Sequence, residues 1–355
     1  MAFNFDICPV GSLGHEDEQY VRVTTRGGAI TIVEIKPDTN SYFERKIDET
    51  SFAEVTAPVP DINCCKALGD VTIGFDLEWW RGDQLAWAGP IEFIRWSTGS
   101  VYIQASDLTS WWNRRIAKTM FFEAMDPVII VQKLHEAAMA EDPVAGFNLV
   151  VNPSGEIATL SSYYEELSYY GDLINSLADY AVDYTAYGRS VLVGASDFLP
   201  ALSYYITDSD WITPPSVEAK GGGAGMATRV IGTDSSGNIA VATAPEAVIN
   251  VYGLVERVVN FDQIEKKEDL KRAVESHLDI MMNPYYVNFH EGNPILKPSA
   301  AIPFEALIPG VQIKVEASST CKTLQAAMRI ASVRNEGSGK ISLGLQPKGT
   351  VGEIL

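Results

Sequence analysis

The sequence contains few of the residues that most often carry catalysis, metal binding or cross-linking. It has only 4 histidines and 4 cysteines among 355 residues. The cysteines Cys8, Cys64, Cys65 and Cys321 show no C-x-x-C spacing, so they predict neither a zinc site nor a redox dithiol. Their scatter favours reduced thiols in a cytosolically made protein over a disulfide framework.

Long apolar runs are also missing. No stretch of roughly 20 uncharged apolar residues occurs, so a membrane-spanning helix is not expected. The N-terminus, M-A-F-N-F-D-I-C-P-V, lacks a basic region followed by a continuous apolar core, and we do not interpret it as a signal peptide. Hydrophobic residues still make up 46% of the chain, which is enough for large cores and excludes a disordered protein.

Positive charge is in deficit. The chain has 27 Lys and Arg against 46 Asp and Glu, a formal net charge of −19. Affinity for nucleic acid comes mainly from Lys and Arg that replace counterions, so this balance disfavours a nucleic-acid-binding protein. Solubility alone is one explanation of the excess negative charge.

Motifs for catalysis or cofactor binding fail at their defining positions. The cluster His15–Glu18 lacks the H-E-x-x-H spacing of a helical metal site, and no G-x-S-x-G nucleophile motif is present. The glycine-rich run Lys220–Gly225 has Met226 where a dinucleotide loop needs its third glycine. Residues Gly337–Lys340 predict a hairpin turn and not a phosphate loop. We therefore expect no catalytic, cofactor-binding or metal-binding residue.

Residues 1–115 predict a first β domain. Short alternating segments flank Gly27-Gly28, the triplet Arg81-Gly82-Asp83 and a later T-G-S turn, which is typical of successive hairpins. Gly89-Pro90 separates the predicted strand at 85–87 from the next one at 91–96. We interpret the Arg-Gly-Asp triplet as such a turn and not as an adhesion motif. Many short strands with glycine turns predict a closed or nearly closed antiparallel barrel.

Residues 116–200 predict an α/β middle domain. Asp126-Pro127 is typical of a helix start, with Asp as the cap and Pro at the first helical position. A second helix after Gly171-Asp172 precedes a hairpin that turns at Tyr187-Gly188. The segment is rich in tyrosine, as protein interfaces often are, although core packing explains any one of them as well. These tyrosines are Tyr163, Tyr164, Tyr169, Tyr170, Tyr180 and Tyr184.

The remaining residues return to strand patterns around a charged helix. Residues 201–260 and 300–346 together predict a second, discontinuous antiparallel barrel. Residues 261–299 predict an inserted helix, whose apolar residues recur at helical spacing, and a short hairpin. Residues 347–355 form a C-terminal tail. At 355 residues the chain suits two or three packed domains.

The stretch from Val251 to Val315 contains the order of elements around which the chain is organised. It begins with V-Y-G-L-V-E-R-V-V, which predicts a short strand from Val251 that is broken by Gly253. It continues with the charged helix and the short hairpin. A proline-rich run then leads through L-I-P-G into an alternating strand. This order resembles the hub proteins of long-tailed phages, the baseplate-hub or tail-associated minor tail proteins. Their fold is shared with the N-terminal part of the type VI secretion spike protein.

The resemblance covers most of the chain and implies a fold. That fold is α+β and mostly β, with two tail-tube-like antiparallel β-barrel domains, the second discontinuous, an α/β middle domain and a helix-hairpin insertion. Two further segments, W-A-G-P-I at 87–91 and A-S-D-L-T-S-W-W at 105–112, are similar to the end of the family's first domain. The structural motif positions that carry the resemblance are Trp87, Gly89, Asp107, Trp111, Tyr252, Gly253, Pro309 and Gly310.

The resemblance also implies a function without enzymatic activity or a cofactor. We expect a homotrimeric tail hub at the tip of the virion tail, assembled in the host cytoplasm, that closes the distal end of the tail tube. It would adapt sixfold to threefold symmetry and form part of the DNA exit channel, where negative charge would repel the passing DNA. Implied partners are the distal tail or tail-tube ring, the tape-measure protein, and spike, fibre or other minor tail proteins. No membrane insertion is implied.

Two functions of other classes stay open. A carbohydrate-binding receptor protein would use clustered tryptophans, although such clusters in strands are more often core. A cell-wall or polysaccharide hydrolase would need a carboxylate pair such as Asp76/Glu78 or Glu165/Glu166 across a cleft. The clustered tryptophans are Trp79, Trp80, Trp87, Trp96, Trp111 and Trp112.

Overall fold

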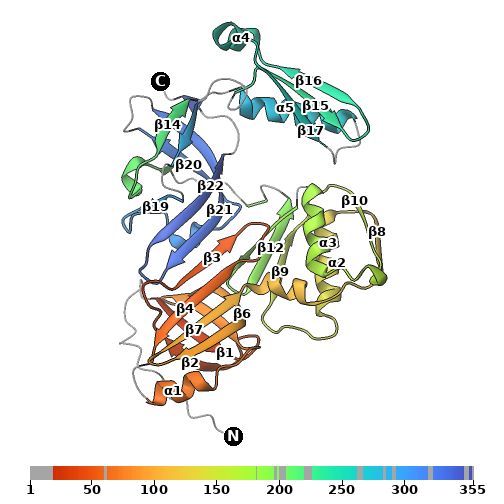
Figure 1. The fold of residues 1–355 in the computed structure, drawn as a ribbon. Helices are drawn as coiled ribbons and strands as arrows, with labels where there is room; N and C mark the ends of the chain where they lie inside the picture. The colour runs from red at the N-terminus through yellow and green to blue at the C-terminus, as the bar shows by residue number, and fades with distance from the viewer. Residues whose placement is uncertain are drawn as a thin grey trace. The chain divides into compact units, whose positions relative to one another are not determined.

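The computed structural model divides the chain into two compact units (Figure 1). Unit 1 comprises residues 1–200, 303–311 and 330–344, and unit 2 comprises 201–302, 312–329 and 345–355. No helix in the described part of the chain is long and apolar enough to cross a membrane. The structure describes residues 19–59, 62–180, 182–195, 198–199, 205–219, 226–261, 267–282, 285–289, 293–318, 323–347 and 352–353.

Unit 1 begins with an antiparallel sheet that combines N-terminal strands with one C-terminal strand. Within this unit the hydrogen-bonded order is β21-β3-β4-β7-β6-β5-β1-β2. Alternation along the strands places Val21, Val23, Leu77 and Trp79 in the core, where all four are fully buried. The elements are β1 Gln19–Thr24, β2 Thr31–Ile35, β3 Tyr42–Lys46, β4 Phe52–Pro58, α1 Ile62–Gly69, β5 Asp76–Arg81, β6 Gln84–Ser97, β7 Ser100–Ser106 and β21 Leu324–Glu336.

The hairpins predicted in this region are confirmed. β1 and β2 pair across Gly27-Gly28, whose φ angles are 83° and 76°. β5 and β6 pair up to Arg81 and Gln84, so Gly82-Asp83 forms the two-residue turn, with Gly82 at φ 56°. The Arg-Gly-Asp triplet is therefore a hairpin turn. Among the described pairings of unit 1 none joins β2 to β21 or to β22 (Ile341–Pro347), which pairs with β21, and closure into a barrel stays a prediction.

Strand β6 pairs with two different strands along its length. Its residues 84–90 pair with β5 and its residues 91–97 pair with β7. A Cβ on Gly89 would lie 1.8 Å from the Ser106 carbonyl oxygen, so the backbone of β7 occupies the space of a side chain. The sequence predicted separate strands on either side of Gly89-Pro90. Instead one strand bends there, because glycine lets the two backbones approach.

The middle segment of unit 1 is the predicted α/β region. β12 pairs antiparallel with β11 and parallel with β9, while β8 and β10 form a separate pair. Figure 1 shows α2 and α3 between these two sheets. Asp126 caps α2 as predicted, because its Oδ1 accepts the Val128 N–H at 2.9 Å. The elements are η1 Leu108–Arg114, β8 Met120–Met125, α2 Pro127–Met139, β9 Asn148–Asn152, β10 Ala158–Ser162, η2 Tyr164–Glu166, α3 Tyr170–Ser176, η3 Leu177–Tyr180, β11 Val182–Tyr187 and β12 Ser190–Ala195.

Unit 2 contains several small sheets. Here β13, β20 and β21 pair in that order, β14 and β18 form a separate two-stranded sheet, and β16-β15-β17 is a three-stranded sheet that packs on α5. Leu270, Val274 and Leu278 of α5 are buried against this third sheet, which confirms the helical spacing predicted for this segment. The elements are β13 Tyr205–Ile206, η4 Asp208–Asp210, β14 Ser216–Ala219, β15 Arg229–Asp234, β16 Ile239–Thr243, α4 Glu246–Tyr252, β17 Glu256–Phe261, α5 Lys267–Met281, β18 Tyr285–Asn288, β19 Ile295–Leu296, β20 Gln312–Ala317 and β23 Gly352–Glu353.

Two groupings differ from the sequence expectation. The predicted strand from Val251 starts later, because residues 246–252 form α4; this helix ends at Gly253, where φ is 80° and the N–H donates to the Ile249 carbonyl at 2.7 Å. The strands of 229–261 also form their own sheet with α5, whereas the sequence grouped residues 201–260 with the last hairpin. The domain boundaries themselves stay a prediction.

Candidate functional site

The last hairpin of the chain completes the N-terminal sheet. Residues 332–336 of β21 pair with residues 42–46 of β3 in antiparallel register, and β22 (Ile341–Pro347) pairs with β21. The pairing is supported by an ion pair between Arg334 Nη1 and Glu44 Oε1 at 3.0 Å, across 290 positions of sequence. Unit 1 is therefore built from both ends of the chain.

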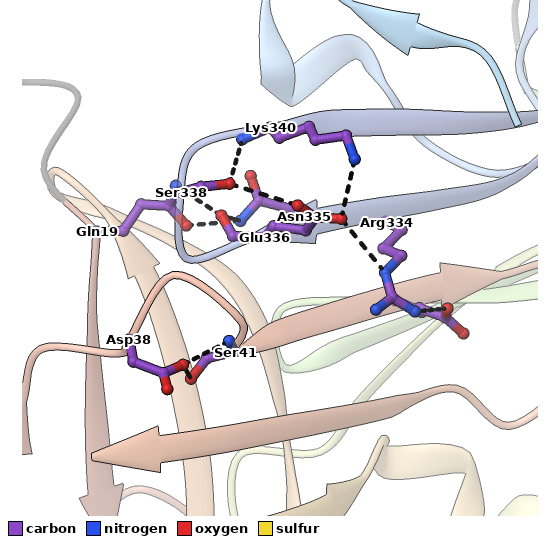
Figure 2. Close-up of polar contacts among 9 residues, drawn as sticks. Gln19, Asp38, Ser41, Arg334, Asn335, Glu336, Ser338 and Lys340 are labelled. Atoms are coloured by element: carbon purple, nitrogen blue, oxygen red, sulfur yellow. Dashed lines mark hydrogen bonds and ion pairs between the residues drawn. The ribbon is translucent and has the colours of Figure 1, made fainter. Parts of the chain in front are cut away.

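The tip of this hairpin is tied to β1 and β5 by buried amides (Figure 2). Asn335 is fully buried, and its Nδ2 donates to Gln19 Oε1 at 2.6 Å. The same oxygen accepts from Trp79 Nε1 at 2.8 Å, while Gln19 Nε2 donates to the Glu336 carbonyl at 3.3 Å. One glutamine thus joins three segments, and each polar atom it buries has a partner.

The turn of the hairpin also fits closely on the β2–β3 connection. The Gly337 N–H donates to the Ser41 carbonyl at 2.7 Å, and a Cβ on Gly337 would lie 2.0 Å from the Asp38 carbonyl oxygen. Asp38 Oδ1 in turn accepts from the Ser41 N–H and hydroxyl, both at 2.8 Å (Figure 2). Only glycine allows this approach, so the position of Gly337 fixes the register in which β21 pairs with β3.

A buried cation, the guanidinium of Arg45, lies on the inward face of β3. Strand alternation in Y-F-E-R-K puts Phe43 and Arg45 on the inward face, and both are 0% exposed. The Arg45 guanidinium donates to the Ala86 carbonyl through Nη2 at 2.7 Å and Nε at 3.1 Å, and to the Leu307 carbonyl through Nη1 at 3.1 Å. Burial lowers the pKa of Arg45 to about 10, so the group stays charged at neutral pH.

Aromatic rings complete the surroundings of this guanidinium. Its Cζ lies 4.4 Å from the ring centre of Tyr187 and 4.7 Å from that of Phe304. Phe304 belongs to the short helix η5 (Phe304–Ala306), within residues 303–311 of unit 1. Arg45 therefore anchors a returning segment of the chain with carbonyl oxygens and ring faces, which favour a cation without neutralising it.

A second arginine joins the middle segment to the N-terminal sheet. Arg189 is the second residue of the β11–β12 turn and donates to Asp76 Oδ2 at 2.9 Å and to Glu78 Oε1 at 2.8 and 2.9 Å. Its side chain is 12% exposed, against 0% for Asp76 and 7% for Glu78. A Cβ on Gly28 would lie 2.7 Å from the guanidinium. The carboxylate pair considered for hydrolysis is thus committed to a structural ion cluster.

The motif positions Trp87, Gly89 and Asp107 come together around Ser51. Asp107 is fully buried; its Oδ2 accepts the Ser51 N–H and hydroxyl, both at 2.6 Å, and its Oδ1 accepts from Thr109. Trp87 Nε1 donates to the Ser51 hydroxyl at 3.3 Å, and the Asp107 backbone lies against Gly89. Burial raises the pKa of Asp107, while these hydrogen bonds act in the opposite direction.

The other motif positions lie elsewhere. Trp111 is buried in unit 1, with the guanidinium of Arg26 4.7 Å from its ring. Gly310, after Pro309, has a φ of 97°, and its N–H donates to the Ile330 carbonyl at 2.7 Å, which turns the chain into β20. Tyr252 and Gly253 end α4 in unit 2, where Tyr252 is 40% exposed.

The structure adds little support for a metal, cofactor, sugar or catalytic site at the residues that the sequence analysis considered. Within the described ranges, no group of three or more His, Cys, Asp or Glu residues has metal-binding geometry. The cluster His15–Glu18 and the run Lys220–Gly225 lie outside the described residues. Of the six clustered tryptophans, Trp79, Trp87, Trp111 and Trp112 are core residues and cannot face a sugar, whereas Trp96 is 53% exposed. Glu165 and Glu166, the other carboxylate pair, are exposed on η2.

Sequence reasoning missed Arg45 and the pair Gln19–Asn335. Arg45 had a signal, since the alternation of β3 places it on the same face as Phe43. A charged residue at an inward-facing position needs hydrogen-bonding or ionic partners, because an unpaired buried charge is costly. Gln19 and Asn335 had none, because ordinary polar residues 316 positions apart reveal their contact only in the folded chain.

Comparison with solved structures shows which fold this arrangement represents. The prophage tail protein gp18 from Listeria monocytogenes EGD-e matches with a TM-score of 0.58 and 13% identity, covering 94% of this chain and 95% of that one. The prophage MuSo2 43 kDa tail protein from Shewanella oneidensis matches with a TM-score of 0.61 and 11% identity, covering 93% and 96%. No protein-family model and no curated protein sequence matches the chain.

The type VI likeness is also present. A chain of the Francisella PdpA-VgrG complex matches with a TM-score of 0.50 and 10% identity, covering 95% of this chain and 54% of that one. The chain therefore has the phage tail protein fold that type VI secretion proteins share, as the order of elements in its sequence predicted. At these identities the likeness concerns the fold.

Proposed function

We propose that the chain is a structural protein of a phage tail, and within it a homotrimeric hub that closes the distal end of the tail tube. The observation that carries this proposal is the end-to-end match to tail proteins, which covers 94% of this chain and 95% of the Listeria protein. We propose no enzymatic function.

The mechanism would be geometric. Each chain would contribute two tube-like β-barrels, one built on the N-terminal sheet of unit 1 and the other on the strands of unit 2. Three chains would then offer six such elements to a sixfold tail tube while presenting threefold symmetry distally. Strand edges that the monomer leaves open would pair around the ring. The net charge of −19 would keep DNA from adhering to the exit channel.

The motif positions would act as joints in this assembly. We assign Trp87, Gly89, Asp107 and Trp111 to the connection between the first barrel and the middle segment, where three of them meet around Ser51. Pro309 and Gly310 would direct the returning chain, and Tyr252 with Gly253 would end α4. These contacts would hold the barrel elements in place when the trimeric ring binds other tail proteins.

The partners would follow from a position at the tail tip. The proximal side would dock on the distal tail or tail-tube ring and on the tape-measure protein. The distal side would hold a spike, fibre or other minor tail protein, and DNA would only pass through. Assembly would take place in the host cytoplasm before the tail joins the virion.

The first experiment is the mass of the purified full chain in solution. Light scattering at several concentrations, followed by negative-stain imaging of the same sample, is expected to give a species of three chain masses and threefold rings. If the chain is a monomer at all concentrations, imaging of assembled tails with a gold-labelled chain decides. Label absent from the tail tip would contradict the proposal.

A further inference from the structure

Strand β8 and the segment around η2, which follows β10, present apolar side chains to solvent in the middle segment of unit 1. Five residues, one on β8 and four on or directly beside η2, make up what we term the β8–β10 patch. Such exposed apolar clusters mark interaction sites more often than single exposed side chains do. The members and their exposed fractions are Phe121 65%, Tyr163 45%, Tyr164 56%, Leu167 60% and Tyr169 43%.

The patch is ordered and not a random spread of side chains. The rings of Phe121 and Tyr163 meet edge to face, with centroids 5.4 Å apart. Phe121 pairs with Ser161 across the two strands, and the described residues add no third strand to this sheet. Both strand edges therefore carry backbone N–H and C=O groups that a partner can use.

Backbone strain is concentrated at the same place. In the described ranges only three non-glycine residues have a positive φ. One of them, Leu167 at 53°, belongs to the patch, and another, Ala124 at 50°, lies on β8 three positions after Phe121. L-residues reach this region at an energetic cost, and such strain is commonly stored where a surface has a function. Here it turns Leu167 outward, where it buries little in the monomer.

Unpaired negative charge surrounds the patch. Glu123 on β8 and Glu165 and Glu166 on η2 are exposed, and within the described chain none of them forms an ion pair. The nearest cation along the chain, Lys118, is already bound to Glu141 at 2.7 Å. The patch therefore combines aromatic area with carboxylates that have no cation of their own.

We propose that the β8–β10 patch is a docking surface for a segment of another protein that carries basic and apolar side chains. Charge complementarity favours such a partner, because the carboxylates at the rim would pair with its Lys or Arg while the rings take its apolar side chains. A second copy of this chain would bring the same three glutamates and a net charge of −19. A neutral glycan would bring neither cations for the carboxylates nor backbone groups for the strand edges.

The test uses the purified full chain and two labelled amphipathic peptides that share one face of Leu and Trp. One peptide has Lys on its polar face and the other has Glu, and fluorescence anisotropy at low salt gives the Kd of each. We expect the Lys peptide alone to bind. Its affinity should fall about tenfold or more in the charge variant Glu123→Lys, Glu165→Lys, Glu166→Lys, and also in Phe121→Ser with Tyr164→Ser.

A matched control separates the patch from the overall charge. Asp70→Lys, Glu268→Lys and Asp279→Lys change the net charge equally at exposed positions on other elements, and they should leave the Kd within about a factor of three. Circular dichroism checks that each variant is folded. Equal weakening by the control, equal binding of the Glu peptide, or no binding of the Lys peptide would each overturn the proposal. So would self-association, or binding of a soluble bacterial polysaccharide, that the patch variants abolish.

Discussion

Two buried arginines of unit 1 hold distant parts of the chain together by different means. Arg189 sits between two carboxylates, Asp76 and Glu78, and neutralises part of their charge. Arg45 contacts carbonyl oxygens and ring faces, and its three hydrogen bonds all go to backbone oxygens. Loss of Arg189 would therefore leave buried charges, whereas loss of Arg45 would leave only buried dipoles.

The difference teaches that the environment decides how costly each replacement is. Removing one member of a buried ion pair costs more than the pair contributes, because the remaining charge stays desolvated. Removing a buried cation also removes its own desolvation cost, which offsets part of the lost hydrogen bonding. Similar burial of two arginines thus predicts unequal effects.

The largest effect is expected for Arg189→Met. We expect a loss of about 3–5 kcal/mol in the free energy of unfolding, because Asp76 and Glu78 would stay buried without a cation. Urea unfolding followed by tryptophan fluorescence measures it. Adding Asp76→Asn and Glu78→Gln to this variant should recover about half of the loss or more, since no unpaired charge is then left. A triple variant less stable than Arg189→Met would show that charge is not the cause.

A smaller loss is expected for Arg45→Met. About 2 kcal/mol is lost, because the Ala86 and Leu307 carbonyls lose their donors while the desolvation cost of the cation disappears. Methionine keeps much of the apolar volume, so cavity formation adds little. The same urea titration provides the value, and hydrogen exchange of the amides in residues 303–311 shows whether the returning segment is released. A loss equal to that of Arg189→Met would remove the distinction between the two sites.

His135 is a third buried base of unit 1, and unlike the two arginines it is neutral in the folded chain at neutral pH. Burial lowers its pKa to about 4, and Trp112 Nε1 donates to its Nδ1 at 3.1 Å, which requires that nitrogen to be unprotonated. The unfolded chain binds the proton more readily, so this group lowers stability as pH falls from about 6.5 towards 4. Between pH 7 and 5 the loss is about 2 kcal/mol.

The measurement compares urea unfolding at pH 7 and pH 5 for the wild-type chain and for His135→Asn, which keeps an acceptor for Trp112. Other groups titrate in both proteins, so the difference between the two pH slopes isolates His135. Parallel slopes would mean that His135 is protonated equally in the folded and unfolded chains.

The smallest effect is expected at an exposed arginine, which serves as the reference. Arg229 pairs with Glu256 at 2.9 Å in unit 2, with side chains 35% and 49% exposed. Arg229→Met should change the free energy of unfolding by about 0–1 kcal/mol, because water and salt screen the pair. A loss comparable to that of Arg45→Met would imply that burial does not control these energies.

Local features were predictable because they depend on neighbouring residues. Asp126-Pro127 starts α2, because Asp126 caps the helix through the N–H of Val128, only two positions along the chain. Leu270, Val274 and Leu278 recur at helical spacing and so face one side of α5. Gly82-Asp83 turns a hairpin that its flanking strands already indicate. The order of such elements also predicted the tail protein fold that solved structures share.

The candidate site was predicted only in part. Trp87, Gly89 and Asp107 were recognised as motif positions, but their meeting at Ser51 depends on the bend of β6 and on the pairing of β4 with β7. The strand expected from Val251 became a helix up to Tyr252, because local alternation does not distinguish a short amphipathic helix from a strand.

The sequence by itself determined the hairpins, the capped helices, the acidic balance and the order of elements, because each arises from side chains a few positions apart or from composition. The tertiary structure alone decided that residues 330–344 complete the N-terminal sheet and that Gln19 meets Asn335. It also decided that one carboxylate pair, Asp76 and Glu78, is closed off by Arg189 while another, Glu165 and Glu166, stays open to solvent. Contacts over such separations are selected by packing of the whole unit, and no local pattern encodes them.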